Sequence, residues 1–140
     1  MKILCGTDIV DIRRMEKHVL PKEDGALPHF VERCFTDKEI EYCMSKKLDR
    51  LKAESMAARF AAKEACAKAL GTGIMTMGIG FTDIEILKDD KGAPYVVLHN
   101  EALRVAEELK IISTSISLSH DGDYAVSFCT MISSAGEEQG

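Results

Sequence analysis

The segment from residue 49 to residue 70, DRLKAESMAARFAAKEACAKAL, constrains the fold of this chain more than any other. It is rich in Ala, Leu, Met, Glu and Lys, contains no Gly or Pro, and is followed by Gly71 and Gly73. These residue types favour an α-helix, and glycines just beyond the last turn are typical of a helix end. Alanines lie almost all around its second half, so we expect that half to be packed on several sides.

The rest of the chain predicts shorter elements. Thr36 and Glu39 have the spacing of a capping box, which predicts a helix start. Asp121-Gly122, between two stretches of alternating residues, is a signal for a two-residue hairpin. In chain order we expect a strand over 2–7 ending in a turn at 6–8, a helix over 9–20, a loop over 21–29, helices over 37–44 and 49–70, a loop over 71–80, strands over 82–88 and 94–98, a helix over 100–110, and strands over 114–120 and 123–129.

This order of elements indicates an α+β fold, in which a mostly antiparallel sheet packs against one long helix and shorter helices. We expect a single domain over 1–132. The last residues, 133–140, read SSAGEEQG and contain no core-forming side chain, so they predict a frayed tail.

Composition narrows the function classes. The net charge of −5 argues against general nucleic-acid binding. Five cysteines without CxxC spacing fit free thiols in a reducing compartment better than a disulfide framework or a zinc site. No apolar run has the length of a signal peptide or a membrane span, so we expect a cytoplasmic protein without a membrane partner.

Asp8 is the first candidate for chemistry. At the end of a strand its carboxylate would be held by rigid backbone, as a metal ligand requires, and Asp11 lies one helical turn further. Asp8 could equally be the N-cap of the helix expected from residue 9, since Asp is a favoured N-cap residue.

Glu64 is the second candidate, because it falls on an apolar stripe of the long helix. A carboxylate on a packed face is costly unless a cation or hydrogen-bond donors compensate it. Lys68, four residues on, could form a helical salt bridge with it. Alternatively, Glu64 binds Mg²⁺, which takes one or two carboxylates plus substrate phosphates. Arg59 and Lys63 add cations nearby that suit a polyphosphate.

Two further features remain open from spacing alone. The glycines between 71 and 80 can bring backbone amides close to phosphate, but they lack the GK[ST] ending of a P-loop. A helix C-cap accounts equally for Gly71. His120 stands beside the expected hairpin and could contact a phosphate or exchange a proton near neutral pH, or it could have no role.

In this order the motifs resemble those of the holo-acyl-carrier-protein synthases, the small 4′-phosphopantetheinyl transferases. The matching stretches cover nearly the whole chain and are GTDIVDI at 6–12, RFAAKEA at 59–65, KALGTG at 68–73, DIEI at 83–86, KGAPY at 91–95 and SLSH at 117–120.

The resemblance implies a reaction and a site. Phosphopantetheine would pass from coenzyme A to a serine of an acyl carrier protein, with Glu64 or a water taking the serine proton and adenosine 3′,5′-bisphosphate leaving. Asp8 and Glu64 would hold Mg²⁺, and with Lys68 they form the expected catalytic set. The residues expected to bind coenzyme A are Arg59, Lys63, Lys68, Gly71, Pro94, Ser119 and His120.

The resemblance also implies a homotrimer with its sites at subunit interfaces. Arg13, Arg14 and Lys17 would form a basic face for the acidic carrier protein. Two other functions remain open. A non-enzymatic module with a ferredoxin-like sheet would show the same alternation, and another metal-dependent phosphotransferase would use the same residue types.

Overall fold

The long helix predicted from the sequence is the centre of the structure. The computed structural model describes residues 1–74 and 78–136, so parts of the glycine-rich loop and of the expected tail lie outside the described residues. α4, Asp49–Ala69, is a 21-residue helix that ends in the left-handed Gly71 (φ 80°). Its alanines are buried on several sides, as expected, and it contributes to both core clusters of the described chain.

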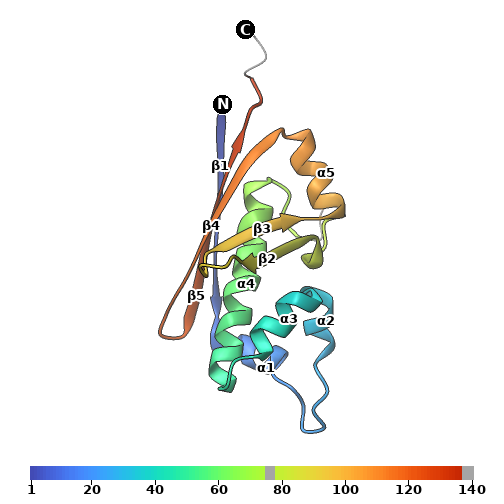
Figure 1. Ribbon diagram of the computed structural model, residues 1–140, viewed down its shortest axis with the longest axis vertical. Helices are drawn as coiled ribbons and strands as arrows, with labels where there is room; N and C mark the ends of the chain where they lie inside the picture. The colour runs from blue at the N-terminus through green and yellow to red at the C-terminus, as the bar shows by residue number, and fades with distance from the viewer. Residues whose placement is uncertain (75–77, 137–140) are drawn as a thin grey trace.

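The elements surround α4 as Figure 1 shows. In chain order they are β1 (Lys2–Asp11), α1 (Ile12–Val19), α2 (His29–Cys34), α3 (Asp37–Met44), α4, a 3₁₀ turn (Phe81–Asp83), β2 (Ile84–Lys88), β3 (Pro94–Leu98), α5 (Asn100–Glu108), β4 (Ile111–Asp121) and β5 (Tyr124–Ser133).

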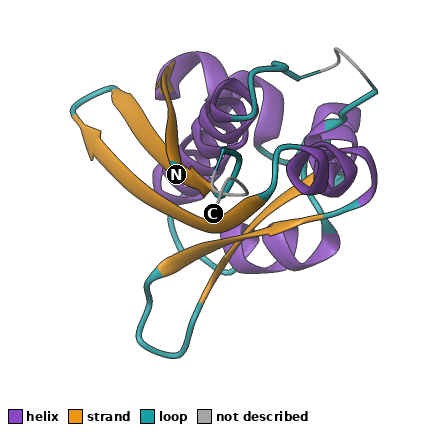
Figure 2. Cartoon of the chain, turned by 90° about the horizontal axis from the view of Figure 1, so that it is seen from above, coloured by secondary structure: helices purple, strands orange, loops and turns teal. Residues whose placement is uncertain are grey.

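The strands form two separate antiparallel sheets in the described chain. β1, β5 and β4 make a three-stranded sheet in the order β1-β5-β4, and β2 pairs with β3. α4 packs against one face of the larger sheet, and the views in Figures 1 and 2 agree on this arrangement. The predicted α+β class is confirmed, with the mostly antiparallel pairing divided between two sheets.

The first strand is longer than predicted. β1 runs through the expected turn at 6–8 to Asp11, so Asp8 lies within the strand and pairs with Ser127. Helix α1 begins only at Ile12, and its N-cap is Asp11, whose side chain accepts a hydrogen bond from the Arg13 backbone N–H. The N-cap reading of Asp8 is therefore wrong.

Gly6 explains why the apparent turn is a strand. A Cβ at this position would lie 2.0 Å from the Ala65 carbonyl oxygen and 2.8 Å from the Ala69 nitrogen. The glycine is needed for close approach of β1 to α4, a use of glycine that sequence alone does not distinguish from a turn.

Of the other local predictions, one is confirmed, one is shifted by a residue, and one helix was missed. α3 and its Thr36–Glu39 capping box are as predicted. The hairpin between β4 and β5 turns at Gly122-Asp123, one residue later than expected, because Gly122 supplies the positive φ (59°) at the first central position. α2 was not predicted, since its six residues are too few for a helical pattern and no side chain caps it.

A buried ion pair joins α3 to α4. Lys63 and Glu39 have fully buried side chains, and their Nζ and Oε1 atoms are 2.8 Å apart. Glu39 also accepts backbone N–H groups of Thr36 and Ile86, while Lys63 donates to the carbonyls of Phe81 and Ile84. These bonds compensate both buried charges.

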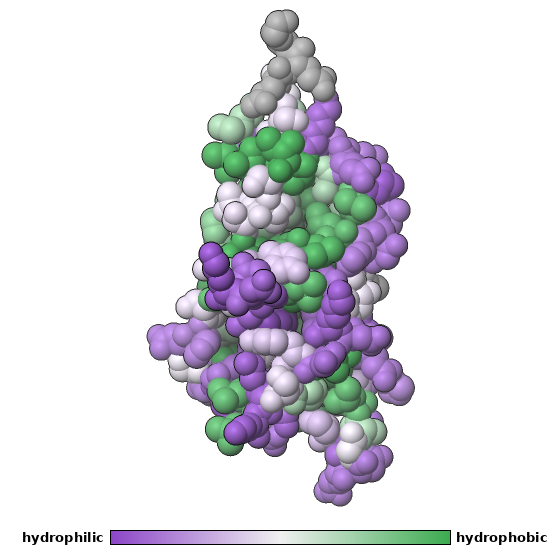
Figure 3. All heavy atoms as spheres, viewed as in Figure 1, coloured by the Kyte–Doolittle hydropathy of each residue, from purple (hydrophilic) through white to green (hydrophobic). Residues whose placement is uncertain are grey.

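The outer surface is mixed. Figure 3 shows apolar side chains gathered in the upper half of the molecule and polar ones along its lower and right-hand parts. No helix among the described residues combines the length and apolar character needed to cross a membrane.

Candidate active site

Asp8 and Lys68 form an ion pair between β1 and α4. The Lys68 Nζ lies 3.1 Å from Asp8 Oδ1 and 2.9 Å from the Thr7 carbonyl oxygen, to which it donates. The sequence allowed a helical salt bridge between Lys68 and Glu64, but Lys68 reaches the neighbouring strand instead. The close contact at Gly6 makes this possible, because it presses β1 against the last turns of α4.

Glu64 lies on the same side of α4 without a bonded partner. Burial raises the pKa of its carboxyl group, the nearby Asp8 carboxylate raises it further, and the Lys68 ammonium opposes both. Among the described residues, none donates a hydrogen bond or forms an ion pair to the Glu64 carboxylate. The structure thus brings the three predicted catalytic residues together and leaves one carboxylate under-compensated.

Asp8 and Glu64 both line a cavity of about 480 Å³. Its wall combines polar groups of β1 and α1 with aromatic rings, and the remaining lining residues are Ile9, Val10, Asp11, Arg14, Met15, His18, Phe30 and Phe60. The rings of Phe30 and Phe60 contact each other at a centroid distance of 5.7 Å. The cavity therefore has an acidic edge and an apolar floor.

The acidic edge fits Mg²⁺. Two carboxylates supply the hard oxygen ligands that this ion prefers, and a cation would offset both the burial of Glu64 and its repulsion by Asp8, which raise the pKa of Glu64. The described residues contain no cluster of three or more Asp, Glu, His or Cys side chains that could enclose a metal. An ion held here would keep positions for other oxygen ligands, such as phosphates.

A second cavity, of about 300 Å³, is lined by three of the residues predicted to bind coenzyme A. Arg59, Ser119 and His120 line it, from α4 and from the end of β4. The Arg59 side chain is only 3% exposed, and one of its terminal nitrogens donates to the Ser55 carbonyl at 3.1 Å. Its Nε is buried without a partner among the described residues, which is costly for a charged group. This arrangement favours an anion as ligand.

The structure places three predicted coenzyme-A residues elsewhere. Lys63 is enclosed in the core, where Glu39, Phe81 and Ile84 accept bonds from its ammonium group. Gly71 is exposed after α4. Pro94 lines a smaller cavity of about 250 Å³ that also contains Lys88 and Leu118.

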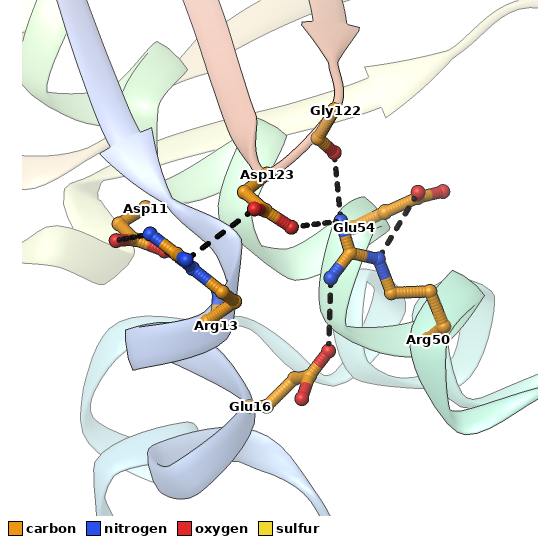
Figure 4. A network of polar contacts seen from close by, with 7 residues as sticks. All are labelled: Asp11, Arg13, Glu16, Arg50, Glu54, Gly122 and Asp123. Atoms are coloured by element: carbon orange, nitrogen blue, oxygen red, sulfur yellow. Dashed lines mark hydrogen bonds and ion pairs between the residues drawn. The ribbon is translucent and has the colours of Figure 1, made fainter.

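The three predicted partner-binding residues of α1 differ from one another. Arg13 is bound to Asp11 through two nitrogens and also pairs with Asp123 at 3.4 Å (Figure 4). Arg14 lines the Asp8–Glu64 cavity. Lys17 makes no ion pair with any described residue. Arg14 and Lys17 are thus available to a partner, whereas Arg13 is occupied.

Arg50 joins the start of α4 to the hairpin and to α1. It donates to the Gly122 carbonyl at 2.7 Å and lies 3.2 Å from Glu16 and 3.5 Å from Asp123 (Figure 4). The hairpin that carries His120 is therefore tied to the helix that carries Arg14.

Sequence reasoning missed part of the second cavity. Tyr42, Lys46 and Lys88 line it beside Arg59. The spacing of Tyr42 and Lys46 places them on one face of α3, which could have drawn attention to the pair. No local pattern indicates Lys88, since it comes from β2 and reaches the cavity only through the tertiary fold.

Comparison with known proteins decides the family. A family model described as the 4′-phosphopantetheinyl transferase superfamily matches residues 4–129. The chain belongs to this superfamily. A curated holo-[acyl-carrier-protein] synthase of Ruminiclostridium cellulolyticum is 45% identical over 131 residues, which are 94% of this chain and 92% of that protein.

Solved structures agree with this membership. The holo-[acyl-carrier-protein] synthase of Helicobacter pylori, in complex with coenzyme A, superimposes with a TM-score of 0.74 at 37% identity and covers 92% of this chain and 100% of that one. A coenzyme A complex of the synthase from Chronobacterium ammoniagenes gives a TM-score of 0.79 at 28% identity, over 95% and 98% of the two chains. The predicted enzyme class, a phosphopantetheinyl transferase of the holo-acyl-carrier-protein synthase type, is confirmed.

Proposed function

We propose that this enzyme transfers the 4′-phosphopantetheine arm of coenzyme A to a serine of an apo acyl carrier protein and releases adenosine 3′,5′-bisphosphate. The names of the relatives and the coenzyme A bound to two of the solved synthases support the substrates. The observation that carries the proposal is that Asp8 and Glu64 line one cavity and that Lys68 pairs with Asp8 at 3.1 Å.

Asp8 and Glu64 would hold a Mg²⁺ ion at the acidic edge of this cavity. When bound, the ion would supply Lewis-acid neutralisation of the charge on the pyrophosphate of coenzyme A. Lys68, which bonds Asp8, would add a positive charge beside the same phosphates. These charges matter because phosphoryl transfer depends mainly on positioning and electrostatic stabilisation.

The proposed reaction forms one phosphorus–oxygen bond, breaks another and moves the proton of the carrier serine. The carrier serine oxygen attacks the β-phosphorus of coenzyme A, and an O–P bond forms to the arm. The bond from that phosphorus to the bridging oxygen breaks, and adenosine bisphosphate leaves with the electron pair. Glu64 or a water beside it accepts the serine proton, as a general base would.

The second cavity would receive the nucleotide part of coenzyme A. Arg59, Lys46 and Lys88 supply its positive charge, with Ser119 and His120 at its edge. The unpartnered Nε of Arg59 supports an anionic ligand there. Pro94 and Gly71 remain predicted contacts, and we leave Lys63 out of the phosphate-binding set because its ammonium is used in the core.

We further propose a homotrimer in which two subunits complete each site. The two cavities share no lining residue, so the catalytic groups and the nucleotide-binding groups of one chain are separate. The face of the β1-β5-β4 sheet away from α4 carries exposed apolar side chains, including Ile9, Val126 and Phe128. Packing these faces together would bury them, and in the proposed trimer the first cavity of one subunit adjoins the second cavity of its neighbour.

Mass spectrometry of an apo carrier protein tests the reaction. Incubated with this enzyme, coenzyme A and Mg²⁺, the carrier should gain the mass of phosphopantetheine. Asp8→Ala and Glu64→Ala should each lower the initial rate by at least about 100-fold, in line with the loss of a group acting on the transition state. Both variants should keep the circular dichroism of the parent.

Two results would overturn the proposal. An unmodified carrier would exclude the reaction, provided several acidic carrier proteins had been tried. Adenosine bisphosphate released at the same rate without carrier would indicate a different phosphotransferase.

A further inference from the structure

Three cationic side chains surround the ring of Tyr42. The Arg59 guanidinium carbon is 4.3 Å from the ring centroid, the Lys46 Nζ is 4.5 Å from it, and the Lys88 Nζ is 5.1 Å from it. The Lys46 ammonium also donates a hydrogen bond to the Tyr42 hydroxyl at 3.2 Å. The cations come from α3, α4 and β2, so the tertiary fold assembles the cluster around one aromatic residue.

The positive charge of this cluster is not balanced from within the described chain. No ion pair joins Lys46, Arg59 or Lys88 to a described carboxylate. The acids that line the adjoining cavities are already engaged, since Glu54 pairs with Arg50 at 3.4 Å and Glu39 pairs with Lys63 at 2.8 Å. Three unpaired cations around one phenol repel one another unless an anion joins them.

The guanidinium group of Arg59 has a fixed orientation in this cluster. Its side chain is almost fully buried, and the Tyr42 ring covers the guanidinium face. Ring stacking of this kind fixes the plane of the guanidinium group, whose remaining nitrogen atoms then point along defined directions. The buried Nε has no partner among the described residues, so a bonding position is left for an anionic ligand.

We propose that Tyr42 positions the cations that bind one phosphate group of the nucleotide, and that its own phenolate competes with that phosphate for them. The inference rests on the proposed function, because it takes the nucleotide of coenzyme A as the ligand of this cavity. The Tyr42 ring holds Arg59 and the hydroxyl gathers the two ammonium groups. Tyr42 is thus a positioning residue.

The titration of Tyr42 is consistent with this geometry. Burial alone raises the pKa of its hydroxyl, but hydrogen bonds from Lys88 and Lys46 outweigh it and lower the pKa to about 8. Below pH 8 the phenol is neutral, and the lysines are free to bind phosphate. Above pH 8 the free protein forms a phenolate among the same lysines, and phosphate binding must then restore the proton. Affinity should therefore fall by up to tenfold per pH unit above 8.

Other charged groups face this cluster from the surrounding elements. They are Lys38 and Glu39 from α3, Glu54 from α4, and His120 from β4. The Tyr42→Phe substitution leaves all of these groups in place. A loss of affinity that begins near pH 8 and disappears with the Tyr42 hydroxyl is therefore specific to this residue.

Calorimetric titration with adenosine 3′,5′-bisphosphate between pH 7 and pH 9.5 tests the inference. Wild-type affinity should begin to fall as pH approaches 8 and should be about tenfold lower at pH 9 than at pH 7. Tyr42→Phe keeps the ring and removes the hydroxyl, so the fall above pH 8 should disappear. Tyr42→Leu also removes the ring over Arg59, so affinity should drop about tenfold at pH 7, within the range of cation–π interactions.

Tyr95→Phe is the matched control. Tyr95 borders the neighbouring cavity, and no cation contacts its ring among the described residues. Its variant should retain the fall above pH 8. A Tyr42→Phe protein that keeps this fall, or a Tyr42→Leu protein with wild-type affinity at pH 7, would overturn the inference and leave the proposed function standing. A wild-type protein that binds no adenosine bisphosphate at any pH would overturn both.

Discussion

Glu64 is the residue whose ionisation depends most on what occupies the cavity. Its pKa is raised by burial and by Asp8, so the folded protein holds this proton more tightly than the unfolded chain does. Below the ordinary pKa the carboxyl is neutral in both states and costs no stability. As pH rises through the folded pKa, ionisation in the cavity destabilises the fold.

Glu64→Gln should therefore raise the melting temperature in the absence of Mg²⁺ at pH 7, and the difference should close at pH 4. Thermal unfolding measured across this range by scanning calorimetry checks both points. Added Mg²⁺ should stabilise the wild type and leave Glu64→Gln unaffected, since the ion in the proposed site needs the Glu64 carboxylate. Glu101→Gln, at an exposed residue paired with Arg104, serves as control. Equal melting curves for wild type and Glu64→Gln at pH 7 would contradict the assignment.

At the level of residues, the motifs identified side chains that the fold brings together, but they did not predict how these side chains bond. Asp8, Glu64 and Lys68 were identified from the motifs, and the structure brings them together. Their bonding was not predictable, because Lys68 pairs with a strand residue distant in sequence. Lys63 looked like a phosphate ligand, yet its partner Glu39 comes from another helix, so only the packed core reveals the pair.

At the level of elements, patterns with many residues predicted the structure well and short patterns did not. α4 matches the predicted helix to within a residue, because a preference for helix recurs in the residue types along its 21 positions. The end of β1 was misplaced because Gly6-Thr7-Asp8 has the composition of a turn. Pairing with β5 continues through these residues, and only the contact with Ala65 explains the glycine.

Helix α1 supports a prediction about the carrier protein. Arg14 lines the Asp8–Glu64 cavity, whereas the guanidinium group of Arg13 is bound by Asp11 and Asp123. Arg14→Ala should raise the Michaelis constant for carrier by about tenfold, a loss of about 1.4 kcal/mol, and should leave that for coenzyme A nearly unchanged. Arg13→Ala should affect carrier kinetics less. Steady-state kinetics with each substrate varied separately provide the measurement.

Salt dependence gives an independent check on the same helix. Exposed charges act mainly on association and are screened over about 10 Å at 0.1 M salt. The wild-type rate at low carrier concentration should therefore fall as salt rises, and Arg14→Ala should weaken that response. If neither the substitutions nor salt changed carrier kinetics, the docking surface would lie elsewhere.

At the level of the whole molecule, the exposed face of the larger sheet predicts self-association. Phe128 is 47% exposed at the centre of this face, opposite Thr7 and Ser117 on the adjacent strands. Phe128→Glu should dissociate the proposed trimer and lower activity at least tenfold, because a charge on each copy would be buried in the interface. Multi-angle light scattering gives the mass of the assembly.

Leu103→Glu is a suitable control for this experiment. Leu103 is 43% exposed on α5, away from the sheet face, so its variant should keep both mass and activity. A fully active wild-type monomer would contradict the trimer. Mixing Asp8→Ala with His120→Ala subunits should restore part of the activity if, as proposed, these residues meet across an interface.

The contact at Gly6 limits how such a site can change in evolution. At this point strand and helix are separated by main-chain atoms alone, and Asp8 and Glu64 are attached on either side of that contact. The spacing of the two carboxylates is therefore set by the thickness of the backbone, which substitution of neighbouring side chains does not alter. The surroundings can diverge to suit another carrier or nucleotide while the width of the proposed metal site stays constant. Widening it would require a larger residue at Gly6, and that change would move the whole helix.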